Sequence, residues 1–390
     1  MSSSTVSPTS FRKILLLDKI TVRILDKLSA LQRVAWVHMP IQWDGKNKRL
    51  YTRPPSETFL WNTLQYFNFI GTIYYLSFIL LTMKYGIKVE TWKILFFTFL
   101  VIAVYCVDVV YFAVAREYRE MALCTKAAFK LPKGFSSLIS TTRKESLMIE
   151  LISTGILVFF FSLVVGLAIT GMFNNLDPII ILLEEFLEDP LPLRLLSAVI
   201  LFIFGCNFIF CIDNYLFLAV FWLTRIILAE LAVKCPQNIK SLIRRGAFGR
   251  AIRTHTLIQF LFILINEIGS VAHPGMYAVG FFGLIVTGTA TIMGRSFLSV
   301  SLFPGMFCIL LSWVLTVSSH VVAIYDQSIL FKASWLTEVE GKLARMQLRA
   351  CKEAKLILHG MGFLDRSFVT TFIDGVINNM VNLVVLVGGN

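Results

Sequence analysis

Three polar side chains recur at four-residue intervals in the last apolar segment of the chain, which reads SFVTTFIDGVINNMVNLVVLVGGN. They are Asp374, Asn378 and Asn382, and this spacing places them on one face of an α-helix. Val385 and Leu386 extend that face toward the C-terminus. A polar stripe in hydrocarbon must face water or a polar partner. Facing water, it would hydrate a cation, Asp374 would bias selectivity, and the apolar end would gate by dewetting. Hydrogen bonding between the helices of a bundle is the structural alternative.

A second set of polar residues lies in earlier apolar segments. The acids are Asp108, Glu150 and Asp213, and they would form a proton or ion relay only if they converge. Such a relay would make the chain a transporter or a membrane enzyme. The structural alternative is that each acid pairs with a nearby basic residue or hydroxyl. The accompanying amides are Asn62, Gln65 and Asn68.

Aromatic residues with a few small polar groups fill the outer halves of the second to sixth apolar segments. This mix is typical of a pocket for a small organic ligand, and it also suits packing or lipid-facing surface. The threonines among them have a further alternative, which is to bond back to their own helix. The candidate ligand-binding residues are Phe97, Phe161, Thr170, Phe202, Cys206, Thr287, Thr291, Met306 and Phe307.

The sequence shows no catalytic or metal-binding cluster. Its five histidines are scattered, whereas a zinc hydrolase needs three convergent ligands. No CxxC pair occurs among the seven cysteines, which argues against a zinc site or an outer disulfide. We therefore expect no cofactor, no metal ion and no enzymatic activity.

Composition indicates the elements that would position these residues. Of the 390 residues, 56% are hydrophobic and 15% are charged, which excludes an ordinary soluble domain. A helix that crosses the hydrocarbon core needs about 20 mostly apolar residues. Seven segments satisfy this criterion, at roughly 59–82, 92–115, 148–172, 194–222, 274–294, 303–325 and 367–387.

Basic residues indicate the orientation of these spans. Of the 36 Lys and Arg residues, 30 fall in alternate connections, and the third-to-fourth connection has none. Since basic residues accumulate on the cytosolic side, the N-terminus is predicted to be cytosolic and the C-terminus extracellular. That orientation is opposite to that of a G-protein-coupled receptor. The same bias explains the net charge of +12, and nucleic-acid binding is excluded because no aromatic-interleaved basic module occurs.

The predicted fold is an all-α membrane protein with seven transmembrane helices and cytosolic helical extensions that form an anchor region. The apolar stretch HTLIQFLFILINEIG, which begins at His255, is expected to be a cytosolic helix, because an eighth span would break the charge alternation. Residues 328–358 are also expected to be helical. The predicted regions are 1–58, cytosolic with an amphipathic helix; 59–325, spans one to six; 326–366, the anchor helix; and 367–390, the last helix and a short extracellular end.

Two stretches carry a resemblance to a known family. GMGFLDRSFVTTFI, at 360–373, is similar to a Gly-aromatic-x-x-Asp/Asn-Arg-Ser pattern that enters a last helix, and the stretch from His255 is similar to a His-Leu…Asn…Phe-Gly pattern. With these and its layout, the chain resembles the arthropod gustatory and odorant receptor superfamily. The gustatory branch ends in Thr-Tyr, five apolar residues and Gln-Phe. Here Asn379-Met380 and Leu386-Val387 stand at those positions, so the chain resembles a divergent member.

The resemblance implies a multi-pass plasma-membrane protein that acts as a ligand-gated, non-selective cation channel. Four subunits would surround a pore lined by their last helices, which makes Asp374, Asn378, Asn382, Val385 and Leu386 the pore candidates. The implied partners are a small organic ligand (a tastant or odorant), membrane lipid, and identical or related subunits. An obligate co-receptor subunit that binds no ligand remains an alternative.

Overall fold

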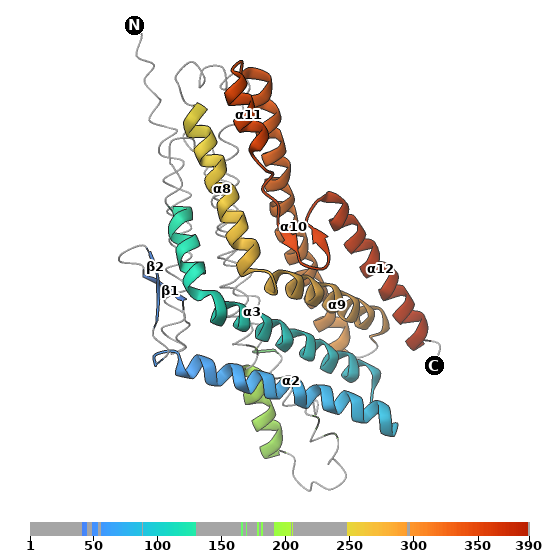
Figure 1. Ribbon diagram of the computed structural model, residues 1–390. Coiled ribbons are helices and arrows are strands. Elements are labelled where there is room, and N and C mark those ends of the chain that lie inside the picture. Colours follow the sequence, from blue (N-terminus) through green and yellow to red (C-terminus); the bar gives the residue numbers. More distant parts are fainter. Residues whose placement is uncertain are drawn as a thin grey trace, which may run out of the picture.

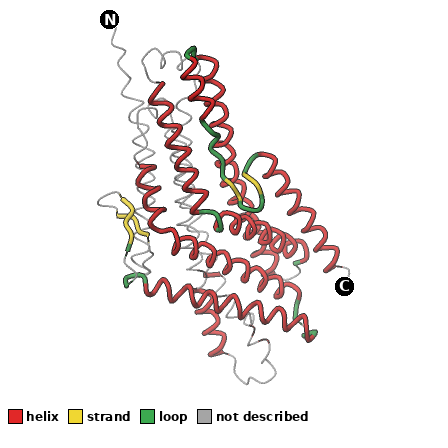
Figure 2. Tube along the Cα trace, in the orientation of Figure 1, coloured by secondary structure: helices red, strands yellow, loops and turns green. Residues whose placement is uncertain are grey.

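In the part of the chain that the computed structural model describes, helices dominate and the strands form two short hairpins (Figures 1 and 2). The structure describes residues 41–44, 49–53, 56–87, 89–129, 165–166, 169, 178, 181, 191–203, 205, 248–294 and 297–388. One hairpin, β1 (Ile41–Asp44) with β2 (Arg49–Thr52), is antiparallel and precedes the first long helix.

Four helices form a packed layer in the order α2, α3, α9, α12 (Figure 1). Their bounds are Phe59–Tyr85, Thr91–Phe129, Ala272–Met293 and Arg366–Gly388. Helix α2 ends at Gly86, whose φ of 62° is left-handed and whose N–H bonds to the carbonyl of Thr82. Glycine adopts this conformation without a Cβ clash, so it can turn the chain directly back into α3.

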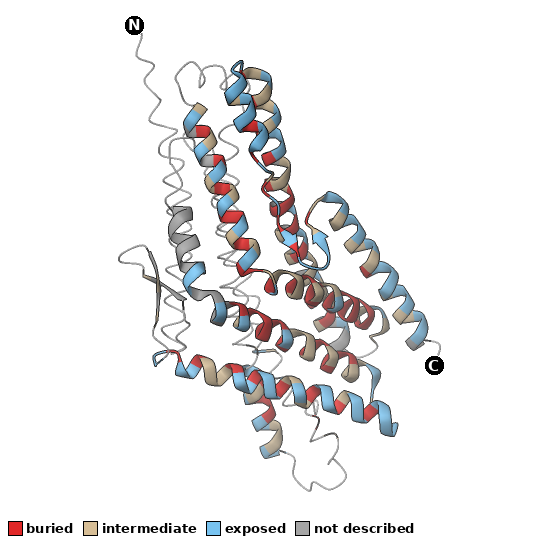
Figure 3. Ribbon diagram, viewed as in Figure 1, coloured by how far each residue is buried: buried red, intermediate tan, exposed pale blue. Residues whose placement is uncertain are grey.

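Helix α9 lies in the middle of this layer and is the most buried of its members (Figure 3). Glycines allow its backbone to approach several neighbours. A Cβ added to Gly275 would lie 2.8 Å from Val109 of α3, and one added to Gly283 would lie 3.0 Å from Leu310. Small residues serve this purpose in membrane helices, where close backbone approach strengthens van der Waals packing. Helix α9 is therefore the element on which α3, α10 and α12 all pack.

A second part of the molecule extends from the layer and contains α8 (Phe248–Ile268), the later part of α10 (Phe297–Glu338) and α11 (Lys342–Ala350). A compact apolar cluster joins the three helices. Its buried members are Ala251, Phe331, Trp335, Val339 and Leu348. Because each helix contributes one face to this cluster, the extension packs as a unit of its own.

Six helices of the described residues are long and apolar enough to cross a membrane. Five of them, α2, α3, α9, α10 and α12, confirm five of the seven helices predicted from the sequence. The sixth is α8, which was expected as a cytosolic helix; it stands with the extension (Figure 1) and joins α9 through a break at 269–271. The predicted spans at 148–172 and 194–222 lie mostly outside the described residues, apart from the apolar helix Leu191–Ile203.

The segment at 328–358 is less helical than expected. Helix α10 ends at Glu338, α11 ends at Ala350, and the chain then runs extended into the hairpin β3 (Ile357–Leu358) with β4 (Gly362–Phe363). Gly360 and Gly362 turn this hairpin with φ values of 84° and 102°. The anchor region predicted at 326–366 therefore contains a helix end, a short helix and a hairpin rather than one helix.

Helix α2 has the polarity expected of a helix at a lipid boundary. Its buried face carries the amides Gln65 and Asn68, and its exposed face carries large apolar residues such as Phe67 and Ile70. Asn68 donates to Gln65 across one turn at 3.3 Å. Polar groups are thus turned toward the protein and apolar groups toward the surroundings, as a hydrocarbon environment requires.

Candidate functional site

Helix α12 differs from α2 in that it exposes polar residues beside apolar ones such as Ile377 and Val381. Val376 is buried, and Val369, Phe372 and Leu383 pack against the main apolar cluster of the molecule. The members of the predicted polar stripe are not on this packed side, because all of them are exposed. They are Asp374, Asn378, Asn382, Val385 and Leu386. The residues grouped by the spacing argument are thus all exposed, and their role as a pore face stays a prediction.

Aromatic rings hold the first half of α12 on α9. Tyr277 meets Phe368 and Phe372 edge-on, with ring centroids 5.8 and 6.1 Å apart, and Phe281 meets Phe372 at 5.5 Å. The Tyr277 hydroxyl lies 3.0 Å from the Ser318 hydroxyl of α10. Edge-to-face pairs each add about 0.5–1.5 kcal/mol beyond the area they bury. These contacts fix the rotation of α12 and so fix which face it leaves exposed.

The second half of α12 packs against a glycine of α9. A Cβ built on Gly288 of α9 would lie 2.3 Å from the Met380 sulfur and 3.1 Å from Phe307. Only a residue without a side chain leaves this space to Met380. Gly375 of α12 likewise leaves space for the ring of Phe281 of α9, because a Cβ built on Gly375 would lie 3.1 Å from that ring. The two helices therefore pack through one glycine on each side.

The exposed face contains polar residues that the sequence reasoning missed. Ser367 and Thr371 are exposed and precede Asp374 by seven and three residues, which places them on the same side of the helix. Thr370 is exposed as well, and its hydroxyl bonds back to the carbonyl of Arg366 at 3.2 Å. The signal was present in the spacing from Ser367 to Thr371 to Asp374. The polar face thus begins at the first turn of α12.

The first turn of α12 is anchored by two polar contacts. Asp365 accepts hydrogen bonds from the backbone N–H of Phe368 and the hydroxyl of Ser367, both at 2.8 Å, so it is the N-cap of the helix. The bond from the Phe368 amide, followed by that from Ser367, lowers the pKa of Asp365. Arg366 is 2.7 Å from Asp326 of α10. The helix start is thereby tied to α10 as well as capped.

Replacing Asp365 by alanine is expected to destabilise the start of α12 by about 1 kcal/mol, the usual cost of losing an N-cap. Because folding lowers this pKa, the stabilisation is present above the unfolded-state pKa and disappears as the pH falls through the folded-state pKa. Thermal unfolding of purified protein at pH 7 and at pH 3 measures both effects. Asp365→Asn, which keeps the accepting oxygen, is the control. Equal melting temperatures for Asp365→Ala and the parent at pH 7 would contradict the capping role.

The candidate ligand-binding residues are only partly brought together. Phe97 and Met306 lie in one buried cluster with Tyr75, Phe78 and Phe303, where helices α2, α3, α9 and α10 meet. Phe307 packs instead toward Gly288, and Phe202 is 37% exposed. The remaining candidates Phe161, Thr170 and Cys206 lie outside the described residues.

The two threonine candidates on α9 bond to their own helix. The Thr287 hydroxyl donates to the carbonyl of Gly283 and the Thr291 hydroxyl to that of Thr287, both at 2.7 Å. This is the back-bonding alternative recognised from the sequence. Thr289 differs, since its hydroxyl is buried without a hydrogen-bond partner among the described residues.

The intramembrane acid Asp108 also follows the structural alternative. It is buried, and its carboxylate lies 3.4 Å from the Thr72 hydroxyl of α2. Nearby, Tyr111 lies 3.4 Å from Asn62. Pairing with a hydroxyl across the helix interface is one way to accommodate a polar group in hydrocarbon. Glu150 and Asp213, the other members of the predicted relay, lie outside the described residues.

Comparison with solved structures identifies the class to which this fold belongs. The chain superposes on the insect olfactory receptor OR5 from Machilis hrabei with a TM-score of 0.63, over 92% of this chain and 96% of that chain, at 11% sequence identity. With the same receptor in complex with eugenol, the TM-score is 0.66 over 98% and 100% of the two chains, at 9% identity. No protein-family model and no curated protein matches the sequence.

The chain is therefore a multi-pass membrane protein with the fold of an insect olfactory receptor. Alignment over nearly the full length of both chains leaves no large region unaccounted for. The resemblance predicted from the sequence is confirmed for the fold.

Proposed function

We propose that the chain is a chemosensory receptor that acts as a ligand-gated, non-selective cation channel. Four copies surround a central pathway, and the exposed face of α12 lines it. Each subunit spans the plasma membrane seven times, with the N-terminus in the cytosol. The shared fold with an olfactory receptor supports this proposal, and the polarity of α12 supports the position of the pathway.

The observation that carries the proposal is the contrast between α2 and α12. Both are candidate spans, but α2 turns its amides inward, whereas α12 turns Asp374, Asn378 and Asn382 outward. A lipid-facing carboxylate and two amides would cost several kcal/mol per subunit. A water-filled axis shared by several copies removes this cost, because the polar face then remains hydrated.

The exposed face also has the chemistry of a cation pathway. Hydroxyls and amides from Ser367 to Asn382 replace part of an ion's hydration shell, and Asp374 supplies negative charge. Past Asn382, the exposed residues are Val385 and Leu386, at 69% and 70% exposure. Four copies of this apolar turn form a constriction that closes by losing water.

The ligand is a small organic molecule of the tastant or odorant class. OR5 has been solved in complex with eugenol, which has an aromatic ring. The cluster that contains Phe97 and Met306 has aromatic side chains from both α2 and α3, and it lies in the layer of helices that holds α12. A flat, mostly apolar molecule with one polar group matches this lining.

Cysteine substitution along α12 tests the pathway. Single cysteines at Asn378 and Asn382 are expected to make ligand-evoked or constitutive current sensitive to a charged, water-soluble thiol reagent. Matched cysteines at Val376 and Leu383, on the packed face, are expected to remain insensitive. The unsubstituted chain, with its seven cysteines, is the control. Reaction at all four positions, or at none, would contradict the assigned face.

Expression of the chain alone tests the wider proposal. Whole-cell current during perfusion with a panel of sugars and volatile organics is the readout, and surface labelling shows whether the protein reaches the membrane. Tetramers at the surface without current would favour a subunit that needs a related partner. Substrate uptake without channel-like current would favour a transporter.

A further inference from the structure

A short extended segment connects α11 to the last helix, and side chains hold it in place up to residue 355. A strand pairs only with its end, where the Leu356 carbonyl accepts from the Leu364 N–H at 3.0 Å and Ile357 lies opposite Phe363. We name residues 351–357 the connecting segment. From Ala354 onward its residues alternate between buried and exposed, with Ala354, Leu356 and Leu358 buried, as in a β-strand. A strand normally pairs its backbone with another strand, so the hydrogen-bond partners of the residues before Leu356 must come from elsewhere.

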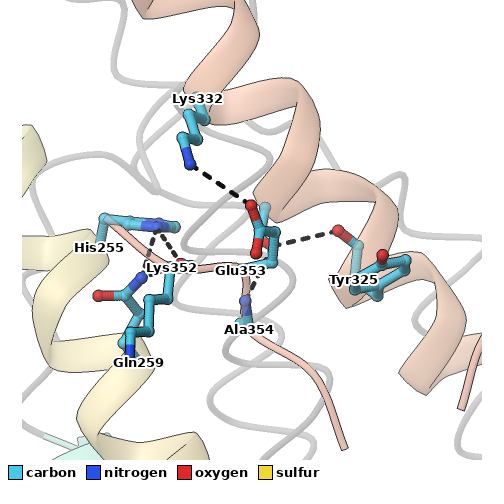
Figure 4. A network of polar contacts seen from close by, with 8 residues as sticks. His255, Gln259, Tyr325, Lys332, Lys352, Glu353 and Ala354 are labelled. Atoms are coloured by element: carbon cyan, nitrogen blue, oxygen red, sulfur yellow. Dashed lines mark hydrogen bonds and ion pairs between the residues drawn. The ribbon is translucent and has the colours of Figure 1, made fainter. Parts of the chain in front are cut away.

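Helix α8 supplies many of these partners along one face. His255, Gln259 and Asn266 follow one another at intervals of four and seven residues, which places their side chains on one side of the helix. Gln259 and Asn266, together with Glu267, interrupt the apolar pattern of α8. Figure 4 shows His255 and Gln259 directed at the backbone of Lys352.

Successive side chains of α8 bond successive backbone groups of the connecting segment. The carbonyl of Lys352 accepts from Gln259 and lies 3.2 Å from a ring nitrogen of His255. Farther along, the Asn266 side chain donates to the carbonyl of Lys355 at 3.0 Å and accepts from the N–H of Ile357 at 2.9 Å. One amide therefore satisfies a carbonyl and an N–H two residues apart, as a paired strand would.

Helix α10 holds the opposite side of the segment. The N–H of Ala354 donates to the Ser328 hydroxyl at 2.9 Å, and Lys332 lies 3.4 Å from the Glu353 carboxylate (Figure 4). A backbone hydrogen bond, with Lys332 adding to it, lowers the pKa of Glu353. The segment is thus clamped between α8 and α10, only nine residues before Arg366 begins α12.

We infer that His255, Gln259 and Asn266 are positioning residues for gating: they fix the connecting segment, and through the β3–β4 hairpin they fix the entry of α12 into the membrane. The Asn266 amide is the central contact, because it alone bonds the segment at two backbone groups. Loosening it changes the balance between closed and open states without changing the pore lining. This inference rests on the proposed channel function.

The test is Asn266→Asp, which exchanges one amide nitrogen for an oxygen of the same size. The carboxylate cannot donate to the Lys355 carbonyl and instead repels it, while the bond from Ile357 is kept. Gln259→Glu makes the same exchange at the Lys352 carbonyl. Glu267→Gln is the matched control, since Glu267 is the exposed next residue on α8 and the exchange is equally small.

Two readouts separate attachment from gating. Backbone amide hydrogen exchange in peptides that cover 351–364 reports attachment in purified protein, and single-channel recording reports gating. In both variants we expect exchange to accelerate by about tenfold, and open probability or the half-activating ligand concentration to shift by a similar factor. Single-channel conductance should stay unchanged, since no pore residue is altered.

The outcomes are distinct. Faster exchange with unchanged gating would overturn the positioning role and leave the segment as a structural element only. Unchanged exchange in both variants would overturn the clamp itself. If the unsubstituted chain passes no current although it reaches the surface with every partner tried, the channel function fails, and the gating role fails with it. A similar gating shift in Glu267→Gln would also overturn the inference.

Discussion

Replacing Asp374 by lysine is expected to abolish cation current in cells that express the chain, while the amount of protein at the cell surface stays the same. Asp374 is exposed, so the substitution is expected to leave the packing of the folded subunit intact. In the proposed assembly, four ammonium groups would replace four carboxylates around the pathway. Each opposes a cation by about 4 kcal/mol at roughly 4 Å and an effective dielectric constant of about 20, which corresponds to about a thousandfold in occupancy.

Two further variants separate charge from shape at this position. Asp374→Asn removes the charge but keeps the size, and it is expected to reduce cation preference while current persists. Glu340→Lys reverses an exposed charge in the extension and is expected to leave current unchanged. Reversal potentials under ionic gradients measure all three. Normal cation current through Asp374→Lys would remove Asp374 from the pathway and contradict the proposed pore.

Replacing Gly288 by leucine is the substitution expected to disturb the last helix most without touching its exposed face. The Met380 sulfur already lies 2.3 Å from the position of the first added carbon, so Met380 and the helix that carries it must move. Overpacking of a filled interior typically costs about 1–3 kcal/mol. We expect a lower melting temperature and loss of ligand-evoked current, because the second half of α12 no longer seats on α9.

A second substitution that makes room for the leucine tests whether the effect of Gly288→Leu arises from its contact with Met380. Met380→Ala combined with Gly288→Leu provides space for the new side chain, and it is expected to restore much of the lost stability. Gly249→Leu is the matched control, since a Cβ at Gly249 meets nothing within 4 Å. Melting temperature in detergent and current amplitude are the measurements. No rescue in the double variant would show that Gly288 and Met380 are not coupled.

Hydropathy and helical periodicity predicted the parts of this fold that depend on neighbours in sequence. The helix at 367–387 was recognised from apolar length, and its polar face from the spacing of Asp374, Asn378 and Asn382. This grouping could be predicted because periodicity assigns side chains to one side of a helix whatever surrounds it. The sidedness of the membrane, which rests on charge alternation, stays a prediction.

Interactions between distant segments account for the errors. Residues 351–358 have a helical composition, yet they are extended because side chains about 90 residues earlier, such as Asn266, bond their backbone. No local pattern contains that information. Thr287 was one of nine pocket candidates, and its hydroxyl bonds back to α9. A pocket depends on which rotamers face each other across several helices, and single-segment patterns do not determine this.

The length of helix α10 means that a small tilt would move its ends by a large distance. Its 42 residues, at 1.5 Å each, make a rod about 63 Å long, roughly twice the thickness of the hydrocarbon core. The rod carries Met306 near one end and Trp335 near the other. A tilt of only about 5° would swing one end of such a lever by about 5 Å, one helical turn. A small displacement of the cluster that holds Met306 would thus become a movement large enough to shift the extension, and a movement of the extension would be transmitted back along the same helix.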